Sequence, residues 1–277
     1  MRAEKVNTNN ATYQKFEVLK NNRNKRHKYR EFLVEGVRNI KEAINKNWNI
    51  KSFIYSDEKN LSDWAKGVID STSTEKNYEL TELLMKDLSG KEDTSELIAI
   101  IGMRDDNLDS IKLSDNPMIA LFDRPSNKGN LGTVIRSCDA LGVECLIITG
   151  HAVDLYDPEV VVASMGSFFN MKVIRAPENK MVLSFIDDMR KRYPTFQSIG
   201  TTAHKEHAIY DLNLSDPVMF MIGNETDGLS NAFMDCCDVL ATIPMVDTSY
   251  ATSFNVGCAA TVMFYEAKRQ RYLYFGE

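Results

Sequence analysis

The chain has 277 residues, of which 43% are apolar and 26% are charged, and its formal net charge is −6. Its length favours about two domains, and the absence of any run of about 18 uninterrupted apolar residues argues against a membrane-spanning helix. An acidic chain is not expected to coat nucleic acid generally, although net charge says nothing about local patches.

The first ten residues, MRAEKVNTNN, lack the apolar segment of a secretory signal. The chain has five cysteines, an odd number, and none of them forms a CxxC pair. Disulfide pairing and a cysteine-based metal site are therefore not expected. These features together favour a cytoplasmic protein without a metal ion.

A basic segment lies near the start of the chain, where Glu17 is the only acidic residue between positions 15 and 30. The simplest interpretation is a solvated, frayed terminus, but a polyanionic substrate would turn it into a binding arm. We predict a basic arm within residues 1–30. Its candidate contacts to a polyanion are Arg23, Lys25, Arg26, Lys28 and Arg30.

The next segment alternates between strand-like and helix-like patterns of apolar residues. The predicted strands are 31–36, 50–56 and 96–103, and the predicted helices are 37–47, 61–70 and 79–89. This alternation predicts a small α/β domain over residues 1–103. The polar segment 104–117 contains four aspartates and a proline near its end, so it is predicted to be a linker.

From residue 118 onward, apolar runs recur that are typical of strands buried on both faces. The predicted strands are 118–123, 145–149, 171–175, 196–201, 218–223 and 239–245. The predicted helices between them are 130–142, 158–166, 179–192, 229–234 and 253–270. The pattern predicts an α/β domain over 118–277, with a mostly parallel sheet covered by helices on each side.

Ligands of open α/β sheets bind at the carboxyl ends of the strands, so the loops there are candidate sites. The first loop, DRPSNKGNLG, has glycines that allow close backbone approach, and Asn130 is a candidate cap for the helix that follows. Arg136 lies further along that helix. Neither GxGxxG nor GxxxxGK[ST] occurs, so a dinucleotide or nucleoside triphosphate site is disfavoured.

Two further loops combine glycines or capping residues with polar side chains. The sequence GNETDGLS places Glu225 directly after an apolar strand, and a turn explains its glycines but not this carboxylate. The third loop, IPMVDTSYATSFN, leads into the last predicted helix, which either Ser253 or Asn255 could cap.

In order and spacing, these loops resemble the three motifs of the SpoU (TrmH-type) branch of the SPOUT methyltransferases. The Asn, Gly and Arg of the first motif are matched by Asn130, Gly132 and Arg136. The second motif is matched by Gly223, Asn224, Glu225, Gly228 and Leu229, and the third by Ile243, Pro244, Met245, Ser253, Asn255 and Val256. Residues 22–101 also resemble the ribosomal-protein-like substrate-binding domain that often precedes this catalytic domain.

The resemblance implies transfer of a methyl group from S-adenosylmethionine to a ribose 2′-hydroxyl in RNA, without a metal ion. It also implies a deep trefoil knot in the C-terminal sheet and a homodimer whose active site is completed across the subunit interface. The two-domain plan favours ribosomal RNA by family analogy. The residues of the basic arm then become candidate RNA contacts.

The resemblance further implies a role for each motif residue. The implied catalytic residues are Asn130, Arg136, Glu225, Ser253 and Asn255. The implied cofactor-binding residues are Gly223, Asn224, Ile243, Met245, Ser253 and Phe254. The family's proposed base is the motif-one arginine, but a guanidinium with a pKa above about 12 is better suited to binding the phosphate beside the target ribose.

The chain departs from the family pattern at three places. Phe254 stands where the family usually has leucine, Val162 stands where relatives often have arginine, and the loop from Met245 to Ser253 is longer than is common. These departures leave open a non-catalytic RNA-binding protein that retains the knotted fold. A transfer RNA ribose methyltransferase is a further alternative.

Overall fold

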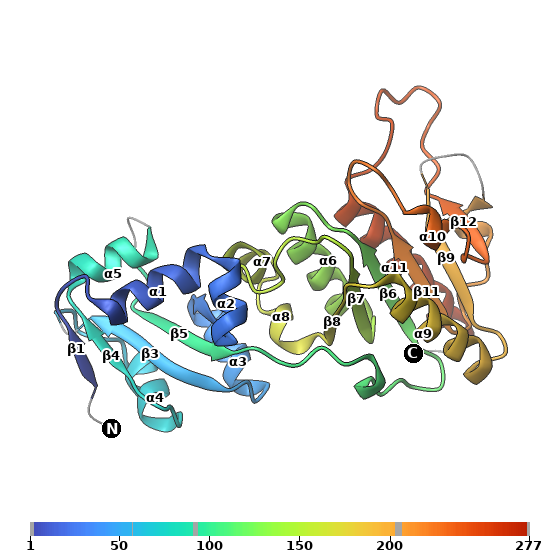
Figure 1. Ribbon diagram of the computed structural model, residues 1–277. Coiled ribbons are helices and arrows are strands. Elements are labelled where there is room, and N and C mark those ends of the chain that lie inside the picture. The colour runs from blue at the N-terminus through green and yellow to red at the C-terminus, as the bar shows by residue number, and fades with distance from the viewer. Residues whose placement is uncertain (1–2, 57, 91–93, 203–206, 276–277) are drawn as a thin grey trace. The chain divides into compact units, whose positions relative to one another are not determined.

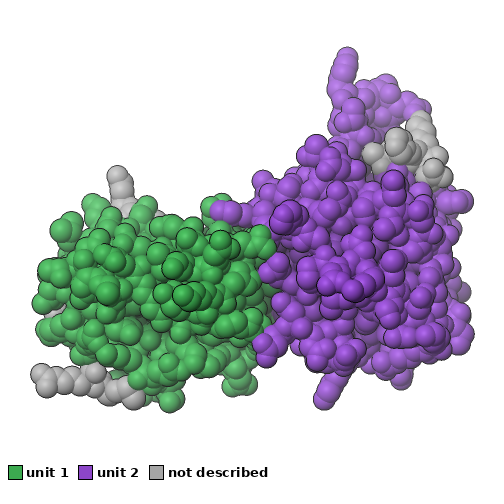
Figure 2. All heavy atoms as spheres, viewed as in Figure 1, with its two compact units in different colours: residues 1–104, 154–170 green, residues 105–153, 171–277 purple. Residues whose placement is uncertain are grey.

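The computed structural model describes the chain outside residues 1–2, 57, 91–93, 203–206 and 276–277. It forms two compact units (Figures 1 and 2). Unit 1 comprises Met1–Arg104 and Asp154–Asn170, and unit 2 comprises Asp105–Val153 and Met171–Glu277. Unit 1 is therefore built from two separate parts of the chain, whereas the sequence pattern places residues 154–170 in the second domain.

Unit 1 contains a five-stranded mixed sheet in the order β1-β4-β3-β5-β2. Its strands are β1 (Glu4–Val6), β2 (Glu31–Glu35), β3 (Ile50–Ser56), β4 (Tyr78–Leu80) and β5 (Leu97–Gly102). β5 runs antiparallel to β2 and β3, whereas β4 is parallel to β1 and β3. The three strands predicted in this part of the chain are present, and the short strands β1 and β4 were not predicted.

Two of the helices of unit 1 are formed by residues of the predicted basic arm. The helices of the unit are α1 (Ala11–Asn21), α2 (Arg23–Tyr29), α3 (Val37–Asn45), α4 (Asp63–Ser71), α5 (Glu82–Ser89), α7 (Pro158–Ala163) and α8 (Ser167–Asn170). Helix α1 buries Tyr13, Phe16 and Leu19 in the core of the unit. The interpretation of this basic segment as a frayed terminus is thus wrong for residues 11–21, because these apolar side chains hold the helix against the sheet.

Aromatic side chains explain why residues 154–170 belong to unit 1. The Phe168 ring lies 5.7 Å from that of Phe32 and 5.5 Å from that of Trp48, between ring centroids. The Trp48 indole N–H also donates a hydrogen bond of 2.9 Å to the Phe169 carbonyl. Such aromatic pairs stabilise a fold by more than the burial of their apolar surface alone would give.

Arg26 connects α2 to the same segment through buried ion pairs. Its side chain is 2% exposed; Nε lies 2.7 Å from Oδ2 of Asp154, and Nη2 lies 3.2 Å from Oδ2 of Asp157. Nη1 donates to two carbonyl groups of α1. The prediction that Arg26 contacts RNA is therefore wrong, because its guanidinium is buried and bound within the unit.

Unit 2 contains a seven-stranded sheet in the order β10-β12-β9-β11-β6-β7-β8, and every neighbouring pair is parallel. Its strands are β6 (Met118–Asp123), β7 (Cys145–Thr149), β8 (Val173–Ala176), β9 (Gln197–Thr201), β10 (His207–Ala208), β11 (Val218–Ile222) and β12 (Val239–Thr242). Every residue of β6, β7 and β11 is buried, as covered parallel strands require. The predicted parallel sheet is confirmed.

Helices cover both faces of this sheet. They are α6 (Lys128–Leu141), α9 (Asn179–Arg192), α10 (Asn231–Met234) and α11 (Val256–Phe275), with short 3₁₀ turns η1 (Leu108–Ser110) and η2 (Ile209–Asp211). On one face, Ile186 of α9 and Phe233 of α10 pack in one core with Leu121 and Met219. On α11, the Phe264 ring lies 5.7 Å from that of Phe220 in β11.

The segment predicted to be a linker packs against unit 2. Leu108, Ile111 and Leu113 lie against the core formed with α9 and α10. The strand order does not test the knot, which remains a prediction from the family resemblance. No helix in the described part of the chain is long and apolar enough to cross a membrane.

Replacing Arg26 by alanine removes the guanidinium partner of the buried Asp154 carboxylate. We expect the free energy of unfolding at neutral pH to fall by about 3–5 kcal/mol, the usual cost of breaking a buried ion pair. Urea denaturation followed by circular dichroism measures this change. Lys28→Ala is the matched control, because Lys28 is exposed on the same helix and its loss is expected to cost less than about 0.5 kcal/mol.

The pH dependence of this effect follows from the Asp154 carboxyl. Burial raises its pKa, but the hydrogen bonds and charge of Arg26, with a contribution from His27, hold the pKa below its ordinary value. Such a group stabilises the fold above the unfolded-state pKa of about 3.9, and this stabilisation is lost as the pH falls through the lower folded-state pKa. The difference between the wild type and Arg26→Ala is expected to shrink below about pH 4; a constant difference would contradict the assignment.

Candidate active site

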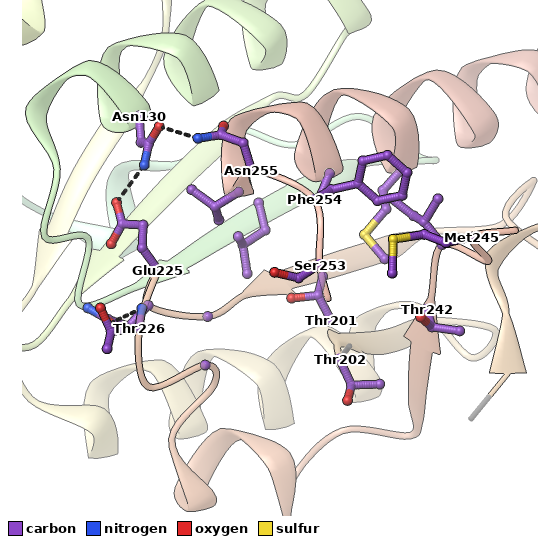
Figure 3. A pocket seen from close by; sticks show the side chains of 18 residues that line it. Asn130, Thr201, Thr202, Glu225, Thr226, Thr242, Met245, Ser253, Phe254 and Asn255 are labelled. Atoms are coloured by element: carbon purple, nitrogen blue, oxygen red, sulfur yellow. Dashed lines mark hydrogen bonds between the residues drawn. The ribbon is translucent and has the colours of Figure 1, made fainter. Parts of the chain in front are cut away.

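Three loops at the carboxyl edge of the unit 2 sheet enclose a cavity of about 430 Å³ (Figure 3). They follow β6, β11 and β12, and β6 and β11 are neighbours in the sheet. The cavity has the size of many small-molecule sites. The predicted site residues that line it are Asn130, Gly223, Asn224, Glu225, Ile243, Met245, Ser253, Phe254 and Asn255.

A fourth loop contributes residues that the sequence did not indicate. Thr201 ends β9 and Thr202 follows it, and both line the cavity, as does Thr242 at the end of β12. β9 lies between β11 and β12 in the sheet, although it precedes both in the chain. Thr201 and Thr202 at the end of a predicted strand were the only sign in the sequence that this loop could contribute to a site. The order of the strands in the sheet, which brings the loop to the cavity, cannot be read from the sequence.

Glu225 binds the N-terminus of α6. Its Oε2 accepts hydrogen bonds from the Ser126 N–H and hydroxyl at 2.9 and 2.6 Å, and its Oε1 accepts from the Asn127 N–H at 3.1 Å and from Nδ2 of Asn130 at 3.2 Å. Burial raises the pKa of Glu225, but these hydrogen bonds lower it below its ordinary value. The carboxylate thus complements the free N–H groups and the positive dipole end of the helix.

Asn130 extends this contact to the third loop. Its Oδ1 accepts a hydrogen bond of 3.0 Å from Nδ2 of Asn255 (Figure 3), and Oδ1 of Asn255 accepts from the Gly257 N–H at 2.9 Å. Asn255 therefore caps α11. The prediction that Asn130 caps α6 is wrong, because Asn127 does so by accepting from the Asn130 N–H.

A close contact between α6 and α11 supports this arrangement. A side chain added at Gly257 would place its Cβ 2.9 Å from Cγ2 of Thr133 on α6. A larger residue at that position would push the two helices apart. Ser137 and Thr261 form a further hydrogen bond of 2.6 Å between the same helices.

The second loop, which lines the cavity, closes on itself. Asn224 and Gly228 exchange two backbone hydrogen bonds, of 2.9 and 3.0 Å, and Oδ1 of Asn224 accepts from two N–H groups inside the turn. A Cβ at Gly223 would lie 2.2 Å from the Leu229 backbone nitrogen. Only glycine fits at position 223, and the Asn224 side chain is used mainly to build the turn.

A buried carboxylate joins this turn to the first loop. Asp123, 1% exposed, accepts hydrogen bonds from the Thr149 hydroxyl, the Ser230 N–H and Nε of Arg124, at 2.8, 2.9 and 3.1 Å. Nη2 of Arg124 then donates to the Gly228 carbonyl at 3.0 Å. These residues were not singled out from the sequence, although an aspartate at the end of an apolar strand is a visible signal.

The charge of the cavity limits which ligands fit. Among the described residues that line it, Glu225 is the only ionisable side chain, and none carries a positive charge. A phosphate group would find no cationic partner there, whereas a cationic ligand would meet no repulsion. Within the described ranges, no group of three or more His, Cys, Asp or Glu side chains is placed to hold a metal ion.

Of the predicted catalytic residues, Arg136 alone lies outside the cavity lining. It lies on α6 between one and two turns beyond Asn130, and its side chain is exposed. No hydrogen-bond partner for it occurs in the part of the chain that the structure describes. The first and third motifs therefore meet through Asn130 and Asn255, without Arg136.

The remaining predicted RNA contacts lie on or directly after α2 in unit 1. Lys28 and Arg30 are exposed, and Arg23 and Lys25 are half-buried. Nη2 of Arg30 donates a hydrogen bond of 3.0 Å to the Arg104 carbonyl. These four side chains are compatible with contacts to a polyanion, unlike Arg26.

Comparison with known proteins gives matches over nearly the whole chain. The model of the SpoU rRNA methylase family matches residues 117–265, which include all three motif loops, and that of the SpoU L30e-like domain matches residues 10–99. The 23S rRNA (uridine(2479)-2′-O)-methyltransferase of Streptomyces viridochromogenes is 38% identical over 269 residues, which cover 97% of this chain and 93% of that protein. The 23S rRNA (guanosine(2553)-2′-O)-methyltransferase of Bacillus subtilis (strain 168) is 24% identical over 88% of this chain and 90% of that protein.

Solved structures show the same similarity in three dimensions. The SpoU methyltransferase AviRb from Streptomyces viridochromogenes, in complex with the cofactor AdoMet, matches with a TM-score of 0.89 at 38% identity. The match covers 95% of this chain and 98% of that chain. The architecture of both units is thus that of a known methyltransferase structure.

Replacing Glu225 by glutamine tests whether its carboxylate holds the loops together. The amide replaces one acceptor by a donor that faces the Asn127 N–H and the Asn130 amide, so we expect the free energy of unfolding to fall by about 1–3 kcal/mol. Urea denaturation measures the loss, and amide hydrogen exchange is expected to show faster opening at the start of α6.

The control is Asp227→Asn in the same turn. The Asp227 side chain is 67% exposed and lies 3.8 Å from Nη1 of Arg124. Such an exposed pair contributes little, so a loss below about 1 kcal/mol is expected. Equal losses in the two variants would show that the Glu225 contacts have no special role.

Proposed function

The chain belongs to the SpoU rRNA methylase family, and we propose that it transfers the methyl group of S-adenosylmethionine to a ribose 2′-hydroxyl of ribosomal RNA. The observation that carries this proposal is the cavity at the carboxyl edge of the sheet, built by the three loops that contain the family's motif residues. Two relatives are named for 2′-O-methylation of 23S rRNA. The matched AviRb structure is named as a complex with AdoMet.

The residues of the cavity fit this methyl donor. Met245, Phe254 and Met263 provide apolar surface for an adenine ring, and Thr201 and Ser253 add hydroxyl groups at the lining. A sulfonium cation meets no positive side chain there, and Glu225 supplies negative charge nearby. When bound, S-adenosylmethionine supplies an electrophilic methyl group. We assign donor binding to Gly223, Asn224, Ile243, Met245, Ser253 and Phe254.

Methyl transfer requires a ribose oxygen in line with the bond that breaks, and it requires removal of the hydroxyl proton. We assign alignment to Asn130 and Asn255, whose side chains are fixed by the chain of hydrogen bonds that starts at Glu225. We assign to Arg136 the binding of the phosphate beside the target ribose. Its bidentate guanidinium would also stabilise negative charge that develops on the ribose oxygen.

We further propose a homodimer in which Arg136 acts at the cavity of the second subunit. Helix α11 has an exposed stripe at helical spacing, formed by Val262, Tyr265, Tyr272 and Leu273, which are 40%, 58%, 61% and 69% exposed. A solvent-exposed apolar stripe of this kind is typical of a protein interface. α11 packs beside α6, which contains Arg136, so one interface would cover the stripe and place this arginine near the partner.

We propose that unit 1 binds the RNA substrate through Arg23, Lys25, Lys28 and Arg30. Its similarity to the SpoU L30e-like domain supports this assignment. Contacts of this kind to phosphates make the affinity fall as the salt concentration rises. Ribosomal RNA is a cytoplasmic substrate, so we expect the protein to act there.

The alternative of a non-catalytic RNA-binding protein is less well supported. Phe254 lines the cavity beside Met245, so this departure from leucine keeps an apolar wall. Val162 lies on α7 in unit 1 and is 47% exposed, outside the cavity lining. Neither departure removes a polar contact in the cavity.

Calorimetry with S-adenosylmethionine tests donor binding directly. We expect micromolar binding to the wild type and a loss of about 100-fold or more in Ile243→Arg, because the new guanidinium would oppose the sulfonium at the lining. Met181→Arg on α9 is the control, since Met181 is 41% exposed outside the lining. Absence of binding to the wild type would favour the non-catalytic alternative.

Mixed dimers test the shared active site. A heterodimer of Arg136→Ala and Ile243→Arg chains, co-expressed with two affinity tags, has one cavity with an intact lining and an arginine from its partner. We expect about half of the wild-type turnover per dimer, since one of two composite sites remains complete. If each site were formed within one chain, the heterodimer would be inactive, because one subunit would lack Arg136 and the other would have a blocked cavity.

A further inference from the structure

Tyr250 is the most exposed large apolar residue in the described part of the chain, with a relative exposure of 104%. It lies in the loop between β12 and α11, where residues 246–255 are all exposed. Figure 1 shows this loop projecting from the body of unit 2. An aromatic ring with no packing within its own chain is available to a binding partner.

Both ends of this loop are anchored at the cavity. Met245 precedes Tyr250 in the chain and Ser253 follows it, and both belong to the lining. Ser253 is three positions after Tyr250, so their Cα atoms lie within about 11 Å of each other. A ribose whose 2′-hydroxyl reaches the cavity would have its own base, or the base of a neighbouring nucleotide, within that range.

Hydrogen bonds within the loop give it a defined turn next to Tyr250. The Ser249 N–H donates to the Val246 carbonyl at 3.0 Å, and the Ala251 N–H donates to the Ser249 hydroxyl at 3.1 Å. These contacts restrict the backbone on both sides of the ring. A partly ordered loop loses less conformational entropy when it binds.

The composition of the loop indicates which part of an RNA it would contact. Residues 243–255, IPMVDTSYATSFN, contain no lysine or arginine, so the loop has no positive charge for phosphates. Its two aromatic residues are Tyr250 and Phe254, and Phe254 already lines the cavity. Base faces stack on exposed aromatic side chains whatever the base, and unpaired RNA bases are commonly bound in this way.

We propose that Tyr250 stacks on a nucleobase at or next to the target nucleotide and thereby holds the ribose at the mouth of the cavity. The inference rests on the proposed function, because it assumes an RNA substrate at this cavity. Tyr250 is a substrate-binding residue in this arrangement, separate from the donor-binding residues. A lid over the methyl donor and a contact to the second subunit are the competing roles for the same ring.

Kinetics with the full-length protein and an in vitro transcript of 23S ribosomal RNA test the proposal. Tyr250→Ala is expected to raise the KM for RNA by roughly 5- to 100-fold, the range that loss of one stacked base gives. Tyr250→Phe keeps the ring and is expected to retain near wild-type KM. Tyr210→Ala, at a tyrosine 61% exposed on η2, is the matched control with unchanged KM.

RNA affinity at several salt concentrations separates stacking from charge. Tyr250→Ala is expected to weaken binding equally at every salt concentration, whereas Lys28→Ala is expected to flatten the salt dependence. Unchanged KM and affinity in Tyr250→Ala would overturn the proposal, as would weaker calorimetric binding of S-adenosylmethionine or a changed oligomeric mass. If the wild type methylates the RNA and Tyr250→Ala shows no defect, only this inference is rejected. If the wild type is inactive, the proposed function is rejected.

Discussion

The contact between the Glu225 carboxylate and the N-terminus of α6 is the interaction on which the rest of the site depends. It joins the second loop to the first, and through Asn130 it fixes Asn255 at the start of α11. Three segments that are distant in sequence thereby share one chain of hydrogen bonds. The negative charge also satisfies N–H groups that a helix always leaves unpaired at its start.

The parallel sheet makes this contact possible because it brings the carboxyl ends of its strands to one edge. β6 and β11 pair directly, so the loops that follow them begin side by side. The buried Asp123 carboxylate and the absence of a side chain at Gly223 then hold the second loop close to the first.

Much of the fold could be predicted from the sequence, since strands buried on both faces appear as continuous apolar runs such as MIALFD and VMFMI. The positions of the three loops followed from the same pattern, and nine of the predicted site residues line the cavity. What the sequence could not reveal depends on neighbours distant in the chain. Arg26 belongs to a basic run, yet it is buried because Asp154 lies opposite it, and Thr201 lines the cavity only because β9 lies between β11 and β12.

Local geometry accounts for a second kind of error. Asn127 and Asn130 are both good capping residues, and α6 begins at Lys128, directly after Asn127, so Asn127 caps it. For Arg136, the sequence predicted the helix but not the direction of the side chain. Arg136 lies on α6 as predicted, yet it is outside the cavity lining, because that depends on which face of α6 is turned toward the loops. A single chain cannot complete that part of the site if the arginine belongs to the partner's cavity.

The claim that this cavity presents a methyl donor to a ribose hydroxyl is tested most directly by mass spectrometry of labelled RNA. Ribosomal RNA is incubated with the protein and S-adenosylmethionine that carries a deuterated methyl group, and the nucleosides are then separated and fragmented. We expect the label on the ribose of one nucleoside, and none with Ile243→Arg. Label on a base, or no label in RNA that the protein binds, would contradict the proposed reaction.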